Sequence, residues 1–137
     1  MKKITKTIAA IFLIAILSMT NIVAFATNEG VSPRLSNMKN GTFNFSAINN
    51  TGYVDVTYNG YDSFVRAELT VKVQKRFLLV IWNDVGEWSA SSTEIYDVFS
   101  HSFSLNGTGM YRAVFTLKVY GNDGTVDTIE ETIESKY

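Results

Sequence analysis

The sequence predicts an all-β protein, a single antiparallel β-sandwich of about seven strands that follows an N-terminal signal peptide. Residues 109–120 alternate between apolar and polar side chains over the length of a whole strand, and several shorter stretches alternate in the same way. Turns that contain Gly and Asn separate these stretches, and no helix longer than one turn is expected after the leader. Short antiparallel strands joined by such turns are typical of a sandwich.

Residues 1–26 have the pattern of a signal peptide. Three lysines lie within the first six residues, residues 8–17 are apolar, and Ala24 and Ala26 place small side chains before the expected cleavage point. We therefore expect a mature chain that begins at Thr27 and is secreted into the extracellular space. The alternative is a retained membrane anchor, which is less favoured because the apolar core has 10 residues and a spanning helix needs about 20.

The composition excludes several classes of function. Removal of the leader would leave 111 residues with nine basic and thirteen acidic side chains, a net charge of −4. Nucleic acid is a poor partner for such a chain, and we expect no membrane contact of the mature form for the same reason. The chain has no cysteine, which excludes disulfides, thiol catalysis and thiolate metal sites. We expect no cofactor.

The first part of the mature chain predicts a flexible segment and then an opening hairpin. Residues 27–41 have no apolar period and hold the only proline, which is typical of a flexible start. The sandwich domain is expected over residues 42–137. Within it, residues 43–48 and 53–58 alternate, and the Asn-Asn-Thr-Gly sequence between them predicts a turn.

Residues 64–76 predict the second long strand. A shift of its register by one residue would bury charged side chains, so the inward face is strongly specified. Residues 77–82, F-L-L-V-I-W, do not alternate and predict a further strand, which is either buried on both faces or exposes an apolar face. The Ser-rich residues 83–93 predict a long loop. The inward side chains expected on the long strand are Val65, Ala67, Leu69, Val71 and Val73.

The strand at residues 109–120 organises the second half of the chain. Residues 96–105 provide a strand before it, and residues 125–134 return after it as a hairpin partner, because the Asp-Gly step between them allows the positive φ that a tight turn needs. Its expected inward side chains are Tyr111, Ala113, Phe115, Leu117 and Val119.

Residues 64–120 resemble an immunoglobulin-like domain. The resemblance depends on Trp82, which follows the long strand, and on the segment Gly109-x-Tyr111-x-Ala113, which resembles the start of a tyrosine-corner strand. It implies an immunoglobulin-like β-sandwich with Trp82 in its interior. It implies no function, because this fold carries many.

The same resemblance implies structural roles for two further residues. The hydroxyl of Tyr111 would bond to the backbone of residues 105–107 and fix the start of the organising strand. Ala113 would stand where immunoglobulin domains place a disulfide, opposite Leu69 or Val71. This chain departs from the pattern there, since it has no cysteine.

A narrower resemblance concerns three short segments. Residues 32–34 (S-P-R), 70–76 (T-V-K-V-Q-K-R) and 111–115 (Y-R-A-V-F), together with the leader, resemble a group of small secreted proteins of Gram-positive bacteria. This resemblance implies a bacterial, secreted protein and assigns no activity or site.

Asp84 and Glu87 are the candidate catalytic pair. They lie between Trp82 and Trp88, and a sugar-cleaving site needs two carboxylates about 5 to 9 Å apart. The simpler interpretation is a solvated loop, since a small sandwich with no second domain to form a cleft rarely hosts hydrolysis. We therefore predict no enzymatic activity, and keep a weak glycoside hydrolase at this pair as the second alternative.

No metal site or catalytic triad is predicted. His101, the only histidine, is expected to be a hydrogen-bonded core or edge residue, because the serines beside it on the same strand point elsewhere. Asn122, Asp123 and Asp127 surround a glycine turn and could offer oxygens to calcium. Their spacing differs from that of a calcium-binding loop, and an ordinary hairpin turn explains them.

We expect a small secreted, non-enzymatic binding or interaction module. If residues 77–82 pair beside the organising strand, their outward side chains share an apolar patch with it, and such a patch usually marks an interface with a protein partner or a second copy. The first alternative is a carbohydrate-binding domain whose glycan rests on Trp88, Tyr58 and Tyr61. The predicted patch consists of Phe77, Leu79, Ile81, Val114 and Tyr120.

Overall fold

The computed structural model describes residues 34–137, of which Leu35–Tyr137 form one compact unit. The expected signal peptide, its cleavage point between Ala26 and Thr27, and the alternative of a retained anchor all lie outside the described residues. In the part of the chain that is described, no helix is long and apolar enough to cross a membrane.

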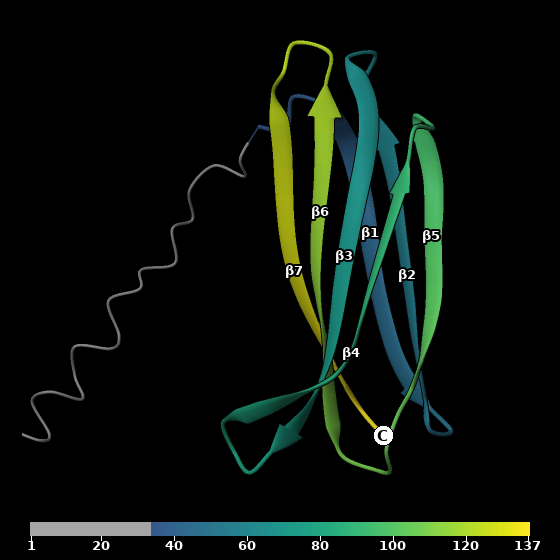
Figure 1. The fold of residues 1–137 in the computed structure, drawn as a ribbon, viewed down its shortest axis with the longest axis vertical. Helices are drawn as coiled ribbons and strands as arrows, with labels where there is room; N and C mark the ends of the chain where they lie inside the picture. Colours follow the sequence, from purple (N-terminus) through teal and green to yellow (C-terminus); the bar gives the residue numbers. More distant parts are fainter. Residues whose placement is uncertain (1–33) are drawn as a thin grey trace, which may run out of the picture. The chain divides into compact units, whose positions relative to one another are not determined.

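The described residues form seven β-strands in two antiparallel sheets (Figure 1). One sheet has the order β1-β2-β5 and the other the order β4-β3-β6-β7. The predicted all-β sandwich of seven antiparallel strands is confirmed. The strands are β1 (Met38–Ile48), β2 (Thr51–Gly60), β3 (Phe64–Phe77), β4 (Ile81–Ser92), β5 (Tyr96–Ser104), β6 (Met110–Gly121) and β7 (Val126–Lys136).

The position of β4 distinguishes this sandwich from a constant-type immunoglobulin domain. In the constant type, the fourth strand lies at the edge of the first sheet. Here β4 pairs with β3 and forms the edge of the second sheet. As a result, β3 has a partner on each side, and β5 is left as the edge of the three-stranded sheet.

The core lies between the two sheets, and β3 and β6 form its centre. All five inward side chains predicted on the organising strand are buried, which confirms its register. On β3, four of the five predicted side chains are buried, while Val65 is exposed because a bulge between Phe64 and Arg66 shifts the first residues of the strand. The alternation predicted for residues 53–58 is also confirmed, since every second side chain there is buried: Val54, Val56 and Tyr58.

The predicted turns lie where Asn and Gly allow a left-handed backbone. Asn49 and Asn50 join β1 to β2 with φ values of 50° and 58°, the conformation that a two-residue hairpin turn requires. Gly124 has a φ of 82° between β6 and β7. The Asp-Gly hairpin prediction is therefore confirmed.

The strand predicted at residues 77–82 and the loop predicted at residues 83–93 are both wrong. β3 continues to Phe77, residues 78–80 form a turn, and β4 runs from Ile81 to Ser92. An apolar run without alternation usually indicates burial, but here it forms the tip of a hairpin. β4 lacks a strand signal because it is a polar edge strand whose alternation is interrupted opposite a register shift in β3.

The start of the domain is held in place earlier than the sequence predicts. Asn37 and Met38 are buried, although both lie in the segment predicted to be flexible. Asp127 on β7 accepts hydrogen bonds from the backbone N–H groups of Ser36 (3.0 Å), Asn37 (2.6 Å) and Met38 (3.2 Å). The Asn37 side chain donates to the hydroxyl (3.0 Å) and the carbonyl (3.2 Å) of Thr125. We call this group the Asn37–Asp127 clasp.

Candidate functional site

The β3–β4 hairpin ends in five consecutive exposed apolar side chains. Their exposed fractions are 55% for Phe77, 69% for Leu78, 85% for Leu79, 81% for Val80 and 47% for Ile81. In Figure 1 this hairpin leaves the lower end of the sandwich and projects to one side. We call residues 77–81 the apolar tip. Exposed apolar groups gathered in this way usually mark a site of interaction.

Leu78 adopts a backbone conformation that disfavours leucine. Its φ is 57°, in the left-handed region, which costs a residue with a side chain roughly 1 kcal/mol. The β1–β2 turn places Asn49 and Asn50 at its left-handed positions, where asparagine is well tolerated. The turn thus holds a largely exposed leucine at a small cost in backbone strain.

The structure separates the members of the predicted apolar patch. Val114 pairs with Lys72 in the middle of β3, and Tyr120 pairs with Arg66 near its start. Tyr120 is also occupied, because its hydroxyl donates to Glu68 at 2.8 Å and the Arg66 guanidinium lies 4.0 Å from the centre of its ring. Only part of the patch therefore stays together, at the apolar tip: Phe77, Leu79 and Ile81.

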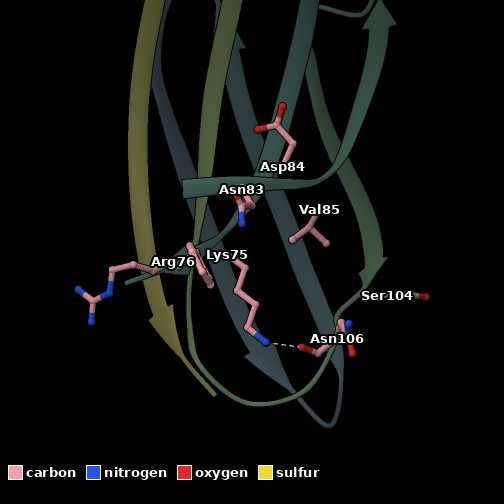
Figure 2. A pocket seen from close by; sticks show the side chains of 8 residues that line it. Lys75, Arg76, Asn83, Asp84, Val85, Ser104 and Asn106 are labelled. Carbon is pink, nitrogen blue, oxygen red and sulfur yellow. Dashed lines mark hydrogen bonds between the residues drawn. The ribbon is translucent and has the colours of Figure 1, made fainter. Parts of the chain in front are cut away.

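A hollow of about 450 Å³ lies at the base of the hairpin (Figure 2). Lys75, Asn83, Val85 and Asn106 are among the residues that line it. The ammonium of Lys75 donates a hydrogen bond to the backbone carbonyl of Asn106, so it is engaged by the segment after β5. The side chain of Arg76 points away from the other labelled side chains in Figure 2. The hollow behind the tip is therefore lined by both polar and apolar side chains.

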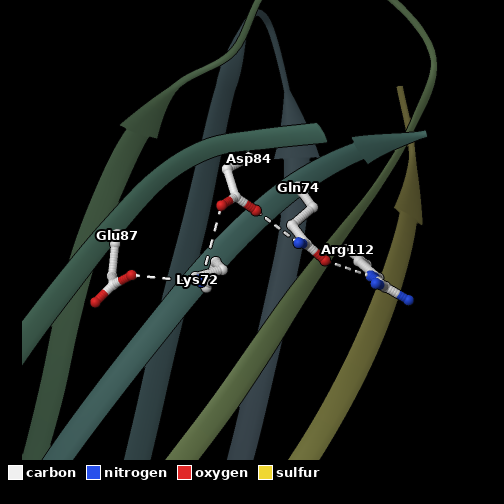
Figure 3. A network of polar contacts seen from close by, with 5 residues as sticks. All are labelled: Lys72, Gln74, Asp84, Glu87 and Arg112. Carbon is white, nitrogen blue, oxygen red and sulfur yellow. Dashed lines mark hydrogen bonds and ion pairs between the residues drawn. The ribbon is translucent and has the colours of Figure 1, made fainter. Parts of the chain in front are cut away.

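A network of polar contacts crosses the outer face of the sheet behind the tip (Figure 3). Lys72 Nζ lies 3.8 Å from Asp84 Oδ2 and 3.7 Å from Glu87 Oε2. Gln74 donates to Asp84 at 2.6 Å and accepts from Arg112 Nε at 2.7 Å. Each exposed ion pair stabilises little by itself, but together the contacts connect β4, β3 and β6 at the root of the hairpin.

Trp82 lies on the outer face of the sheet, which corrects its predicted place in the interior. It pairs with Arg76 across the hairpin and is partly exposed. The guanidinium of Arg112 lies 4.2 Å from the centre of its ring, which is a cation–π contact. The register shift between Val73 and Gln74 leaves Trp82 on the face that carries the polar network.

Trp88 is the tryptophan that faces inward. It pairs with Val71 and packs against the core. Its ring stacks on His101 of β5, with 4.6 Å between the ring centres and 7° between the planes, and Phe103 contacts the same histidine edge-on at 4.9 Å. His101 is therefore an exposed edge residue held by aromatic stacking between the edge strands β4 and β5.

The three aromatic residues predicted for glycan binding do not form a common platform. Tyr58 is fully buried, and its hydroxyl donates to the carbonyl of Glu94 at 2.6 Å. Burial raises the pKa of Tyr58. Trp88 is stacked in the sandwich, and Tyr61 is exposed elsewhere, with the Lys39 ammonium 5.7 Å from its ring centre. The prediction for Tyr58 is wrong, since a buried ring cannot contact a sugar.

Asp84 and Glu87 flank an ammonium group instead of an open space. Both carboxylates contact Lys72, and both side chains are more than half exposed on the outer face of the sheet. In a glycosidase the space between the two carboxylates holds the bond that is cleaved. Here Lys72 occupies that space, so the arrangement gives no support to a hydrolase.

The acidic residues around the β6–β7 turn are used by the fold. Asp123 accepts hydrogen bonds from the hydroxyl (2.6 Å) and the backbone N–H (3.0 Å) of Thr125, which hold the pKa of Asp123 below its ordinary value. Asp127 belongs to the Asn37–Asp127 clasp. Among residues 34–137, no three acidic or histidine side chains gather in a way that could hold a metal ion.

The tyrosine corner is present as the immunoglobulin-like resemblance implied. Tyr111 is fully buried, and its hydroxyl lies 2.7 Å from the carbonyl oxygen of Gly107 and 2.9 Å from that of Asn106. Ala113 is buried, between Val73 and Ile133 in register. Its predicted place opposite Leu69 or Val71 is wrong, because those residues pair with Leu117 and Phe115 in the same sheet. These two residues fix the lower end of β6, which supports the root of the hairpin.

Sequence reasoning missed three residues of this site. Leu78 and Val80 are more exposed than four of the five predicted patch members, and Arg112 covers Trp82. The available signal was the order of the residues, since a basic pair precedes the apolar run and a tryptophan follows it. No protein-family model matches the chain, and no curated protein is significantly similar to it. The function is therefore inferred from the geometry.

Proposed function

We propose that this protein is a small secreted, non-enzymatic binding module that engages its partner through the apolar tip. The observation that supports the proposal is the run of five apolar side chains, three of which are more than two-thirds exposed. None of the five belongs to the described core. The sandwich therefore stays intact without them. Exposing five apolar side chains to water costs free energy, and their use in binding offsets this cost.

The root of the hairpin supports this role because it holds the tip in a fixed direction. β3 pairs with β6 up to Lys75, only two residues before the tip begins. Beyond this, Arg112 connects β6 to the hairpin through Gln74 and through the ring of Trp82. A binding surface that is ordered in advance loses less conformational entropy when its partner arrives.

Binding to isolated cell envelopes tests the proposal. Envelopes of a Gram-positive bacterium present proteins, polysaccharides and lipids together, so the test does not assume one partner. The double variant Leu79→Ser/Val80→Ser should reduce the bound fraction of the protein at least tenfold. The measurement is co-sedimentation of protein recovered from culture medium, with folding checked by the melting temperature.

The matched control changes two exposed valines at the opposite end of the sandwich. Val65 and Val126 are each 45% exposed, and Val65→Ser/Val126→Ser should bind as the wild type does. Equal binding of all three proteins would contradict the proposal. Purified peptidoglycan serves as a separate arm, and tip-independent binding there would favour the carbohydrate-binding alternative.

A further inference from the structure

We propose that the partner of the apolar tip is the surface of a phospholipid bilayer, into which the hairpin inserts while the sandwich stays in water. This inference rests on the proposed function, because it takes the tip as the binding surface. It departs from the expectation that the mature chain avoids membranes, which depended on net charge alone.

The shape of the tip fits a bilayer better than a protein surface. Leu78, Leu79 and Val80 are the most exposed of the five residues and form the end of the hairpin. All three are aliphatic, and they are convex, so a protein partner would need a deep groove to cover them. A lipid surface closes around such a tip without any matching shape, to a depth of roughly 5 to 10 Å.

The charges near the tip fit the phosphates of lipid headgroups. Residues 75–83 contain Lys75 and Arg76 and no acidic side chain. Arg112 adds a third cation beside Trp82. The carboxylate closest to the tip along β4, Asp84, is engaged by Lys72 and Gln74. The hairpin over residues 75–83 is thus basic although the chain is acidic overall, while farther back Glu134 pairs in register with Arg112. Basic groups near a membrane surface attract anionic lipids.

The aromatic residues of the hairpin occupy the level where a membrane interface would lie. Phe77 and Trp82 stand at the two sides of the hairpin, behind the aliphatic end, and both are partly or largely exposed. Tryptophan concentrates at the boundary between headgroups and hydrocarbon because its ring is apolar and its N–H is polar. The aliphatic end is therefore followed along the hairpin by Phe77 and then by Trp82 and Arg76, which pair with each other at one level, so the apolar groups lie farthest out and the polar and cationic groups lie where headgroups would begin.

A second copy of the chain is a poorer occupant. Two tips placed together would bring Arg76 and Arg112 of one copy close to the same cations of the other. The contact would also be small, because a stable interface buries about 800 Å² on each partner and the tip has five side chains.

Vesicle flotation tests the inference. The protein recovered from culture medium is mixed with vesicles of phosphatidylcholine, or of phosphatidylcholine with phosphatidylglycerol in a three-to-one ratio. The wild type should float with both, and more strongly with the anionic vesicles. Leu79→Ser/Val80→Ser should lower the apparent affinity at least tenfold, while the control Val65→Ser/Val126→Ser should change it less than twofold. Arg76→Gln should weaken binding to the anionic vesicles alone.

Each other outcome overturns the inference. A wild type that floats with neither vesicle, yet binds envelopes through the tip in a protease-sensitive way, shows a protein partner and leaves the proposed function standing. Equal flotation of wild type, tip variant and control places any lipid contact outside the tip. If the wild type binds neither envelopes nor vesicles through the tip, the proposed function fails as well.

Discussion

The two ends of β3 differ in what they bury and expose. Ser63, directly before β3, donates to Asn37 of the clasp at 3.1 Å, where polar groups are buried, while the last residue of β3, Phe77, begins the apolar tip, where apolar side chains are exposed. The clasp satisfies its polar atoms, since no buried side-chain nitrogen or oxygen among the described residues lacks a partner. The tip leaves its side chains in solvent. Each region thus reverses the usual distribution of polar and apolar groups.

This difference separates the residues that stabilise the fold from the residues available for binding, at the two ends of one strand. A buried polar group contributes to stability only while its partners remain, and its loss is costly because the partners stay buried. An exposed apolar side chain contributes little to folding and is available for binding. Changes at the clasp should therefore destabilise the fold, and changes at the tip should alter binding while leaving the fold intact.

The largest effect is expected from Asp127→Ala in the clasp. Three backbone N–H groups would lose a carboxylate acceptor, and we expect a loss of about 3 kcal/mol in the free energy of unfolding. Denaturant unfolding measures this value. Asp123→Ala is the control, because that carboxylate lies in an exposed turn and its loss should be much smaller. Equal losses would remove the distinction between clasp and turn.

Tyr111→Phe should have the next largest effect, at the end of β6 closest to the tip. The carbonyl groups of Asn106 and Gly107 would lose the tyrosine hydroxyl, and we expect a loss of about 1 to 3 kcal/mol. The melting temperature checks it. Tyr53→Phe, at an exposed position on β2, should leave the melting temperature unchanged. A Tyr111→Phe protein as stable as the wild type would mean that the corner does not support the fold.

A small effect of opposite sign is expected at Leu78. Glycine adopts the left-handed backbone at this position without strain. This gain offsets the roughly 0.5 to 1 kcal/mol of stability that a glycine otherwise costs through its larger loss of chain entropy on folding. Leu78→Gly should therefore be as stable as the wild type or slightly more stable. Leu79→Gly has no such relief, because Leu78 is the tip residue with a positive φ, and should lose about 0.5 to 1 kcal/mol. If Leu78→Gly lost as much, the strain at Leu78 would be disproved.

The smallest effect is confined to alkaline pH and concerns Tyr58. Burial raises its pKa above the ordinary value of 10.0, so the unfolded chain releases this proton at a lower pH than the folded protein does. Stability from this residue is therefore complete below pH 10 and falls as the pH rises further. Unfolding from pH 9 to 11 should show a steeper decline for the wild type than for Tyr58→Phe. Tyr96→Phe, an exposed position, should follow the wild type.

The sequence predicts a strand and its register well where one face of the strand is buried and the other is exposed to solvent. The alternation of Ala113, Phe115 and Leu117 with polar residues could be recognised because burial of one face imposes a period of two. β4 could not be recognised from the sequence, because an edge strand needs few apolar side chains and the bulge in β4 breaks the period of two. The same limit applies to the candidate site, since an apolar run has the same composition whether it is buried or placed at a hairpin tip.

The Asn37–Asp127 clasp could not be predicted from the sequence for a different reason. Asp127 and Asn37 are ordinary turn residues in the sequence, and their roles depend on partners about ninety positions away. Trp82 shows the same dependence at shorter range, because a register shift of one residue decides which face of the sheet it occupies.

The span of the clasp has a consequence for how the chain folds. Its hydrogen bonds join residues separated by 88 to 91 positions, so the two ends of the domain must meet before it can form. Contacts between residues far apart in the sequence form slowly, because the chain loses conformational entropy before the contacts stabilise it. A chain that crosses a secretion pore from its N-terminus would reach the far side with Asn37 early and Asp127 late. In such a crossing the clasp could close only after Asp127 had followed Asn37 to the far side, so the domain would lack these hydrogen bonds until β7 had emerged.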